Sequence, residues 1–186
     1  GCDTASGSGA DYSVMQVVSL DGMEQIAELR AQIPTDVFAA KIAAYINGIA
    51  GITSNYIAAV EYEKYGATVI WELEKTHGIK VFKTDKGKYW ETDSITKPMM
   101  IMDMEELIRK DKIIINSETL YNECFIYNYD DKGSTNAAPS YNDDSIISLA
   151  IALQMRKSIR PRFTATELEV FYGAPKTRHN EMDIEK

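Results

Sequence analysis

The most constraining feature of the chain is a long apolar stretch that follows two adjacent carboxylates. Asp143 and Asp144 precede residues 145–153, in which most side chains are aliphatic or small. This pattern predicts a buried helix over residues 143–157, ended by Pro161. Acidic side chains are favoured in a first turn, because unpaired N–H groups and the helix dipole attract them. Taken alone, the two aspartates therefore indicate only a helix N-cap.

Strand-like and helix-like segments alternate through the rest of the chain. Residues 13–20 are typical of a strand, Asp21-Gly22 of a hairpin turn, and residues 23–33 of a second strand. The short apolar runs at 57–61 and 79–83 are typical of central strands covered on both faces. The pattern predicts an α/β domain with a mixed sheet and helices on its faces. Further helices are expected at 34–49, 67–76, 96–110 and 117–124, a strand at 112–115, and an exposed β-hairpin at 125–129 and 135–141.

Length and composition favour one soluble α/β domain. The 186 residues suit one domain over 1–160, with a loosely packed or disordered tail at 161–186. No apolar run approaches the roughly 20 residues of a membrane span, and without a secretory signal we expect a cytoplasmic protein with no membrane partner. Cys2 and Cys124 form no disulfide framework, and no histidine has a partner at zinc-ligand spacing. The net charge of −8 argues against a large nucleic-acid surface but is compatible with an acidic site beside a basic groove.

A basic and aromatic segment is the candidate for such a groove. It contains Lys83, Lys86, Lys88 and Trp90. These side chains can contact a phosphate backbone and stack on a base or sugar. The alternative is a solvated hairpin with one buried tryptophan. The sequence leaves both interpretations open.

Carboxylates on separate elements form a candidate metal site. Asp3 belongs to the first strand, Glu61 ends a central strand, and Asp143 and Asp144 begin the last helix. Magnesium and manganese prefer oxygen ligands, and a two-metal phosphodiester site needs several carboxylates from different elements. Spacing alone does not separate this site from the acids found at strand ends in any α/β protein.

The residues around these acids resemble the nuclease domain of tailed-phage terminase large subunits. Gly-Cys-Asp3-Thr-Ala-Ser-Gly-Ser-Gly-Ala-Asp11 is similar to its opening, with a second aspartate eight positions after the first. Ala-Ala-Val-Glu61-Tyr-Glu-Lys-Tyr-Gly66 is similar to its strand, acid and glycine block. Asn-Asp143-Asp144-Ser-Ile-Ile-Ser-Leu-Ala resembles its final acidic helix. The three blocks occur in the family's order.

The resemblance implies an RNase H-like fold, with a central mixed sheet of five or more strands, helices on both faces and a β-hairpin insertion. It implies an endonuclease that cuts concatemeric double-stranded viral DNA during packaging. Asp3, Glu61 and Asp144 would hold two magnesium or manganese ions, with Asp143 as co-ligand or cap and Asp11 as an acid near the site. The terminase ATPase domain, the small terminase subunit and the portal would be partners in the host cytoplasm.

The chain departs from the family's pattern in several places. Only two residues precede Asp3, so the first strand is expected to be short and to hold Asp3 poorly. Asn142 stands where a histidine is frequent, and Glu63 where an asparagine is frequent. No Walker A motif occurs, which indicates an isolated nuclease domain. Two alternatives remain: another RNase H-like nuclease such as a Holliday-junction resolvase, and a catalytically silent module that docks on DNA or protein.

Overall fold

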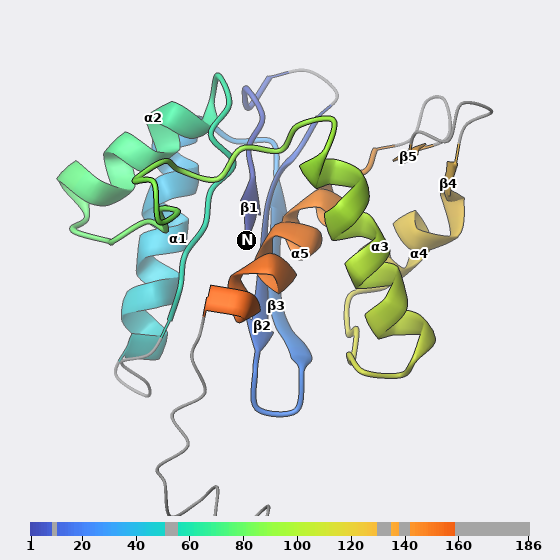
Figure 1. The fold of residues 1–186 in the computed structure, drawn as a ribbon. Helices are drawn as coiled ribbons and strands as arrows, with labels where there is room; N and C mark the ends of the chain where they lie inside the picture. Colours follow the sequence, from blue (N-terminus) through green and yellow to red (C-terminus); the bar gives the residue numbers. More distant parts are fainter. Residues whose placement is uncertain (9–10, 51–55, 130–134, 138–141, 159–186) are drawn as a thin grey trace, which may run out of the picture.

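A three-stranded antiparallel sheet in the order β1-β2-β3 lies at the centre of the protein (Figure 1). The computed structural model describes residues 1–8, 11–50, 56–129, 135–137 and 142–158. β2 (Ser13–Ser19) and β3 (Glu24–Ala31) form the predicted hairpin, and β1 (Cys2–Asp3) pairs with β2. The turn between β2 and β3 contains Gly22 at a φ of 89°, a left-handed conformation that glycine adopts without steric cost.

On the other side of β1, the sheet continues through isolated parallel bridges. Cys2 pairs with Val60, and Ala58 pairs with Val81. The Cys2 N–H donates to the Ala59 carbonyl at 2.8 Å, and the Glu61 N–H donates to the Cys2 carbonyl at 3.0 Å. β1 is short, as expected, but hydrogen bonds hold it on both sides, so Asp3 is better held than its position near the start of the sequence implied.

The predicted strands at 57–61, 79–83 and 112–115 pair only through isolated bridges and do not form regular strands. The third of them pairs through one bridge, between Ile114 and Glu24. Within the described residues, the regular central sheet therefore has three strands instead of the five or more that we expected. Each segment meets the sheet for only a few residues before the chain turns into the next element, which leaves no room for a continuous ladder.

Helices cover both faces of the sheet, as predicted (Figure 1). On one face lie α1 (Thr35–Ala50) and α2 (Gly66–Trp71), which continues as the π-helical turn η1 (Glu72–Thr76). On the other face lies α5 (Asp144–Met155), followed by the short 3₁₀ turn η2 (Arg156–Ser158). α3 (Thr96–Arg109) and α4 (Glu118–Ile126) pack beside α5. No helix in the described part of the chain has the length and apolar character needed to cross a membrane.

α5 is the central helix that its apolar run predicted. Its residues are buried from Ser145 through Ile151 and again at Leu153 and Met155. Burying one leucine or isoleucine side chain stabilises a fold by about 1.5–3 kcal/mol, so this helix contributes a large share of the core. The predicted hairpin after α4 is present as β4 (Tyr127–Tyr129) and β5 (Thr135–Ala137). The predicted C-terminal tail at 161–186 lies outside the described residues.

The alternation of side chains along the strands determines which way the acidic residues point. Cys2 and Val60 belong to the core between the sheet and α1, whereas Ala59 belongs to the core around α5. Successive side chains of a strand point to opposite faces. Asp3 and Glu61, which follow Cys2 and Val60, therefore point toward the face that α5 covers.

Candidate functional site

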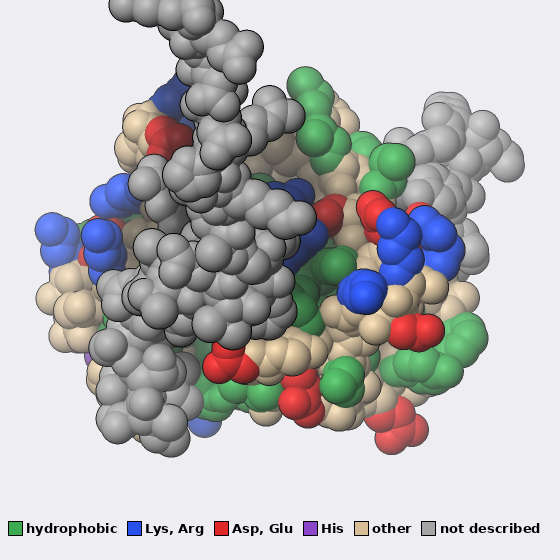
Figure 2. All heavy atoms as spheres, turned by 60° about the horizontal axis from the view of Figure 1, so that its bottom comes forward, with side chains coloured by type: hydrophobic (Ala, Val, Ile, Leu, Met, Phe, Trp, Pro, Cys, Tyr) green, Lys and Arg blue, Asp and Glu red, His purple; other side chains and the backbone are tan. Residues whose placement is uncertain are grey.

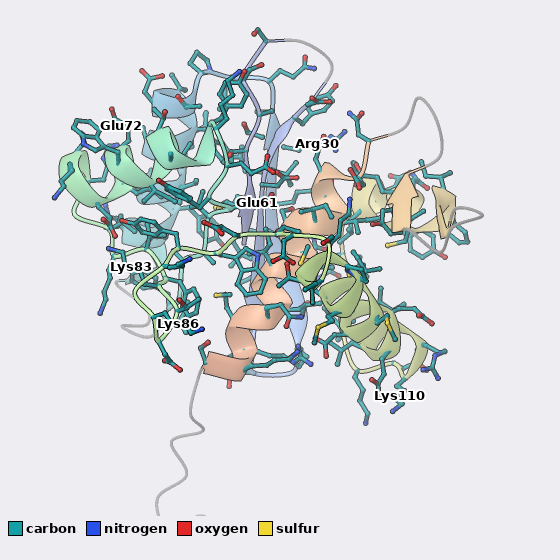
Figure 3. The ribbon with its side chains drawn as sticks, turned by 45° about the horizontal axis from the view of Figure 1, so that its top comes forward. Arg30, Glu61, Glu72, Lys83, Lys86 and Lys110 are labelled. Atoms are coloured by element: carbon teal, nitrogen blue, oxygen red, sulfur yellow. The ribbon has the colours of Figure 1, made fainter. Side chains whose placement is uncertain are left out.

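Asp3 and Glu61 are neighbours on two adjacent parallel segments. Because Cys2 pairs with Val60, the next residue on each segment falls in the same register and on the same face. Neighbouring strands lie about 4.8 Å apart, which brings the two carboxyl groups side by side. Glu61 is only 7% exposed, and Asp3 is half-buried. Figure 3 shows Glu61 at the centre of the molecule, between the sheet and the helices.

Burial and mutual repulsion make both carboxylates electrostatically unfavourable when they are ionised. Burial raises the pKa of Asp3 well above its usual range, and the negative charges of Glu61, Asp144 and Asp143 raise it further. Burial also raises the pKa of Glu61, although hydrogen bonds with Thr92 and Asp3 partly offset the effect. The same influence of Asp144 and Asp143 on Asp3 indicates that the aspartates at the start of α5 lie near this pair. A cation would relieve the repulsion.

Asp144 reaches the site from the first turn of α5 and is held by the loop before β2. Its Oδ2 accepts a hydrogen bond from the Tyr12 N–H at 3.1 Å. Burial raises the pKa of Asp144, whereas the Tyr12 amide and the charge of Arg30 lower it. Asp11 is exposed, and its negative charge also acts on Asp144. The structure therefore places Asp11 close to the site, where the resemblance implied an additional acid.

Asp143 occupies the N-cap position but does not cap the helix with its side chain. Its φ of −119° and ψ of 14° differ from the extended conformation of typical capping residues, and its carboxylate makes no cap hydrogen bond. The carboxylate instead accepts a hydrogen bond from the Lys97 Nζ at 3.2 Å. The expectation that Asp143 holds the helix end is corrected in this respect. Lys97, at the start of α3, is a cation beside the acids that the sequence did not reveal.

Trp90 lies next to the site, and the three lysines lie apart from it. Trp90 bridges Glu61, is half-buried, and its Nε1 donates to the Thr92 Oγ1 at 3.3 Å. Lys83 lies 3.4 Å from a Glu74 oxygen and 4.5 Å from the centre of the Tyr89 ring. In Figure 3, Lys83 and Lys86 lie together below η1 and away from Glu61. Lys88, like Lys86, is exposed.

The donor set fits a hard divalent cation in its chemistry. All candidate ligands are carboxylates, which magnesium and manganese prefer. The Thr4 hydroxyl, directly after Asp3, is buried without a hydrogen-bond partner among the described residues, and an ion's water could satisfy it. Among these residues, however, no three acidic, histidine or cysteine side chains stand close enough together to complete a metal site.

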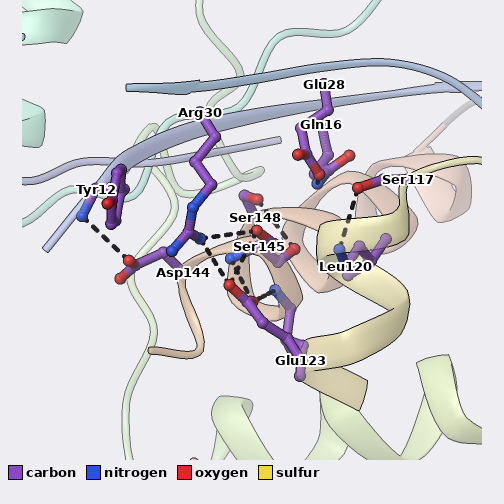
Figure 4. Close-up of polar contacts among 11 residues, drawn as sticks. Tyr12, Gln16, Glu28, Arg30, Ser117, Leu120, Glu123, Asp144, Ser145 and Ser148 are labelled. Carbon is purple, nitrogen blue, oxygen red and sulfur yellow. Dashed lines mark hydrogen bonds and ion pairs between the residues drawn. The ribbon is translucent and has the colours of Figure 1, made fainter. Parts of the chain in front are cut away.

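Arg30 and Glu123, which the sequence did not single out, hold the start of α5. Glu123 of α4 is only 6% exposed, and its Oε1 lies 2.6 Å from the Nη1 of Arg30 on β3 (Figure 4). Nothing in the sequence distinguishes Glu123 from the exposed Glu118 of the same helix, because the burial of Glu123 depends on how three distant elements pack. A hollow of about 700 Å³ beside this pair is lined by Tyr12, Arg30, Asn122, Phe125 and Asn142, among others.

Comparison with known proteins identifies the fold. The chain is similar to the large terminase nuclease from the thermophilic phage G20c, with a TM-score of 0.65 and 23% identity over 83% of this chain and 79% of that one. The same nuclease with bound magnesium matches with a TM-score of 0.65 and 23% identity over 83% and 78% of the two chains. Its cobalt-bound form matches with a TM-score of 0.62 and 22% identity over the same shares. No protein-family profile and no curated protein sequence matches.

Proposed function

We propose, on the basis of a fold shared with a large terminase nuclease, that this chain is a metal-dependent endonuclease domain acting on double-stranded DNA. Its substrate would be concatemeric viral DNA during genome packaging, and its architecture the RNase H-like one that the sequence resemblance implies. The observation that carries the proposal is the pair of half-buried Asp3 and buried Glu61, which lie side by side with unfavourable charge on the face where Asp144 arrives.

The proposed chemistry depends on Asp3, Glu61 and Asp144 as ligands for two magnesium or manganese ions, with Asp143 as a further ligand. Bound there, the ions would supply a water of lowered pKa and neutralise charge at the scissile phosphate. The Tyr12 amide fixes the orientation of Asp144. The Lys97 ammonium, which neutralises Asp143, is placed to attract the phosphate and to stabilise negative charge that develops on it.

Manganese binding and plasmid nicking test the proposal together. We expect wild-type protein to bind Mn²⁺ in a calorimetric titration and to nick supercoiled plasmid in its presence. Asp3→Ala and Asp144→Ala should each lose more than the roughly 10- to 100-fold in affinity that changes outside a metal's ligand set cost. Asp85→Ala is a matched control, because Asp85 is exposed in a turn distant in sequence from the acids. It should bind Mn²⁺ as the wild type does.

The same assays separate the alternatives. A folded wild-type protein that neither binds Mn²⁺ nor cleaves DNA would contradict the nuclease and favour a docking module. Cleavage of four-way junctions much faster than linear duplex would instead favour a resolvase. An ATPase motor domain, a small terminase subunit and a portal in the host cytoplasm are partners that belong to the terminase proposal, and pull-down with each of them would test it.

A further inference from the structure

The first turn of α5 is capped by a side chain from another helix. The Ser145 N–H and the Ile146 N–H donate to the Glu123 Oε2 at 3.0 and 3.3 Å. The first N–H groups of a helix have no partner within the helix and carry the positive end of its dipole. A carboxylate at this position satisfies both needs. Glu123 therefore does for α5 what the Asp143 side chain does not.

Arg30 ties this cap to the sheet. Its Nη1 donates to the Glu123 Oε1 at 2.6 Å and to the Ser145 Oγ at 3.2 Å (Figure 4). The Ser145 hydroxyl also lies 3.2 Å from the Glu123 Oε1. The guanidinium stacks 3.9 Å from the centre of the Tyr12 ring. β3, α4 and the start of α5 thus meet in one hydrogen-bonded network.

This network reaches Asp144 from two sides. Ser145, the next residue of α5, is bound by Glu123 and Arg30, and the Tyr12 amide that holds the Asp144 Oδ2 belongs to the residue on which Arg30 stacks. A buried ion pair is a poor source of stability, because desolvation of both charges offsets their attraction. Its directional hydrogen bonds, by contrast, fix a helix end within narrow limits, as a ligand for a metal requires.

We infer that Arg30 and Glu123 are positioning residues that hold Asp144 in the orientation a metal needs. The inference rests on the proposed function, since it gives Asp144 a ligand role. Residues that orient metal ligands without contacting the metal typically change its affinity by about 10- to 100-fold when they are replaced. The pair therefore sets metal affinity through the placement of α5.

The test compares the two ends of α5. Glu123→Gln keeps the shape of the cap but removes its charge, and Arg30→Met removes the tie to the sheet. The matched control is Arg156→Met at the other end, where Arg156 forms a two-pronged pair with Asp103 of α3 at 2.5 and 2.8 Å. The side chains of Arg30 and Arg156 are 18% and 22% exposed, so the two substitutions replace arginines of comparable burial.

Two measurements are made on each variant: the Mn²⁺ dissociation constant by calorimetry, and hydrogen exchange at the Ser145 and Ile146 amides in metal-free protein. We expect Glu123→Gln and Arg30→Met to weaken Mn²⁺ binding about tenfold or more and to speed exchange at both amides. Arg156→Met should lower the melting temperature but keep wild-type Mn²⁺ affinity and exchange at these amides. Arg30→Lys keeps the positive charge but not the planar donor geometry of the guanidinium, so its Mn²⁺ affinity should lie between those of Arg30→Met and the wild type.

The outcomes distinguish the inference from the function on which it rests. Wild-type affinity and exchange in both Glu123→Gln and Arg30→Met would overturn the positioning role while leaving the nuclease proposal intact. Equal weakening by Arg156→Met would also overturn it, because the effect would then be one of general stability. If the wild type binds no Mn²⁺, the proposed function fails instead. Should Glu123→Gln not fold, Arg30→Met alone decides.

Discussion

At the scale of single residues, Asp3 combines an electrostatic cost to the folded state with a proposed role in metal binding. Its carboxyl group is buried beside three other acids, and its pKa lies well above the usual range. Because the folded state holds this proton more tightly than the unfolded state, stability is greatest at low pH for this group. Its contribution falls as pH rises from the unfolded pKa of about 3.9 through the raised folded pKa. Without metal, Asp3 therefore contributes less to stability at neutral pH than at low pH.

Asp3→Asn should consequently stabilise the metal-free protein. We expect the free energy of unfolding at pH 8 to rise by on the order of 1 kcal/mol, which is typical when a strained functional site is relieved. For a domain of this size, that corresponds to an increase of about 2–4 °C in the melting temperature. Added Mn²⁺ should stabilise the wild type, by mass action, far more than the variant. Thermal unfolding with and without Mn²⁺ measures both effects.

Asp85→Asn controls for the change in charge, since Asp85 is exposed and its replacement should alter stability by less than about 0.5 kcal/mol. If metal-free Asp3→Asn protein were less stable than the wild type, other groups of the fold would have to stabilise the Asp3 carboxylate. That result would count against a cation site.

The sequence revealed the proposed metal ligands more readily than the residues that hold them in place. Asp3, Glu61 and Asp144 stand at element ends that periodicity and resemblance both identify. Lys97 and Glu123 act through hydrogen bonds that span 46 and 22 residues of sequence, respectively. Neither hydrogen bond leaves a local pattern, because it exists only once helices have packed. The capping role expected for Asp143 failed for the same reason: a distant carboxylate satisfies the amides first.

At the scale of elements, the contact between α2 and the segment that ends at Glu61 depends on Gly66. A Cβ atom added to Gly66 would lie 1.8 Å from the Glu61 carbonyl oxygen and 3.1 Å from the Thr4 Oγ1. Real Cβ atoms do not approach backbone so closely, so the start of α2 would have to move. That movement would displace Glu61 and the backbone of its neighbour Tyr62, which hydrogen-bonds the Trp90 carbonyl.

Gly66→Ala should therefore destabilise the protein by about 1–3 kcal/mol, as forced overpacking does. It should also weaken Mn²⁺ binding, because Glu61 shifts. Gly48→Ala offers the opposite control: Gly48 lies inside α1 with open space around it, and alanine there should be neutral or stabilise by up to about 1 kcal/mol. Chemical denaturation of both variants measures the difference. Equal stability of the two would contradict the close approach.

Helices were predicted more accurately than strands, for a physical reason. The pattern of an amphipathic or apolar helix extends over many residues, as in α3 and α5. A local cap adds to the signal: the Ser117 hydroxyl accepts a hydrogen bond from the Leu120 N–H at 3.1 Å at the start of α4. The segments at 57–61 and 79–83 are just as apolar as true strands, yet they pair through single bridges. The apolar content of a segment indicates that it is buried. How many residues it pairs with a neighbouring strand depends on the loops that connect it to the sheet, which a local sequence pattern does not describe.

At the scale of the whole molecule, charge limits how DNA can bind. The chain carries a net charge of −8 and would repel a polyanion at long range. On the face in Figure 2, the described basic side chains stand in separate groups among acidic and apolar ones, without a continuous basic stripe. The proposed binding of DNA would therefore depend on a local group of lysines together with neutralisation of the acidic site. Lys86 and Lys88 are the candidates for this contact. Lys83, in the same segment, is left out because it already pairs with Glu74.

Replacing Lys86 and Lys88 by glutamine should weaken binding to linear duplex DNA and flatten its dependence on salt. Each phosphate that a lysine no longer neutralises lowers the slope of log affinity against log salt by roughly 0.9. The slope for the double variant should thus fall by between one and two such increments, measured by fluorescence anisotropy in Ca²⁺, which takes the same oxygen ligands.

Lys110→Gln with Lys112→Gln removes as much charge from exposed positions at the end of α3, and Lys110 lies on the opposite side of the molecule from Lys86 (Figure 3). An equal loss of DNA affinity in both double variants would show that binding depends only on the total charge of the protein. A weakening confined to Lys86 and Lys88 would place the duplex over the segment that carries these two exposed lysines.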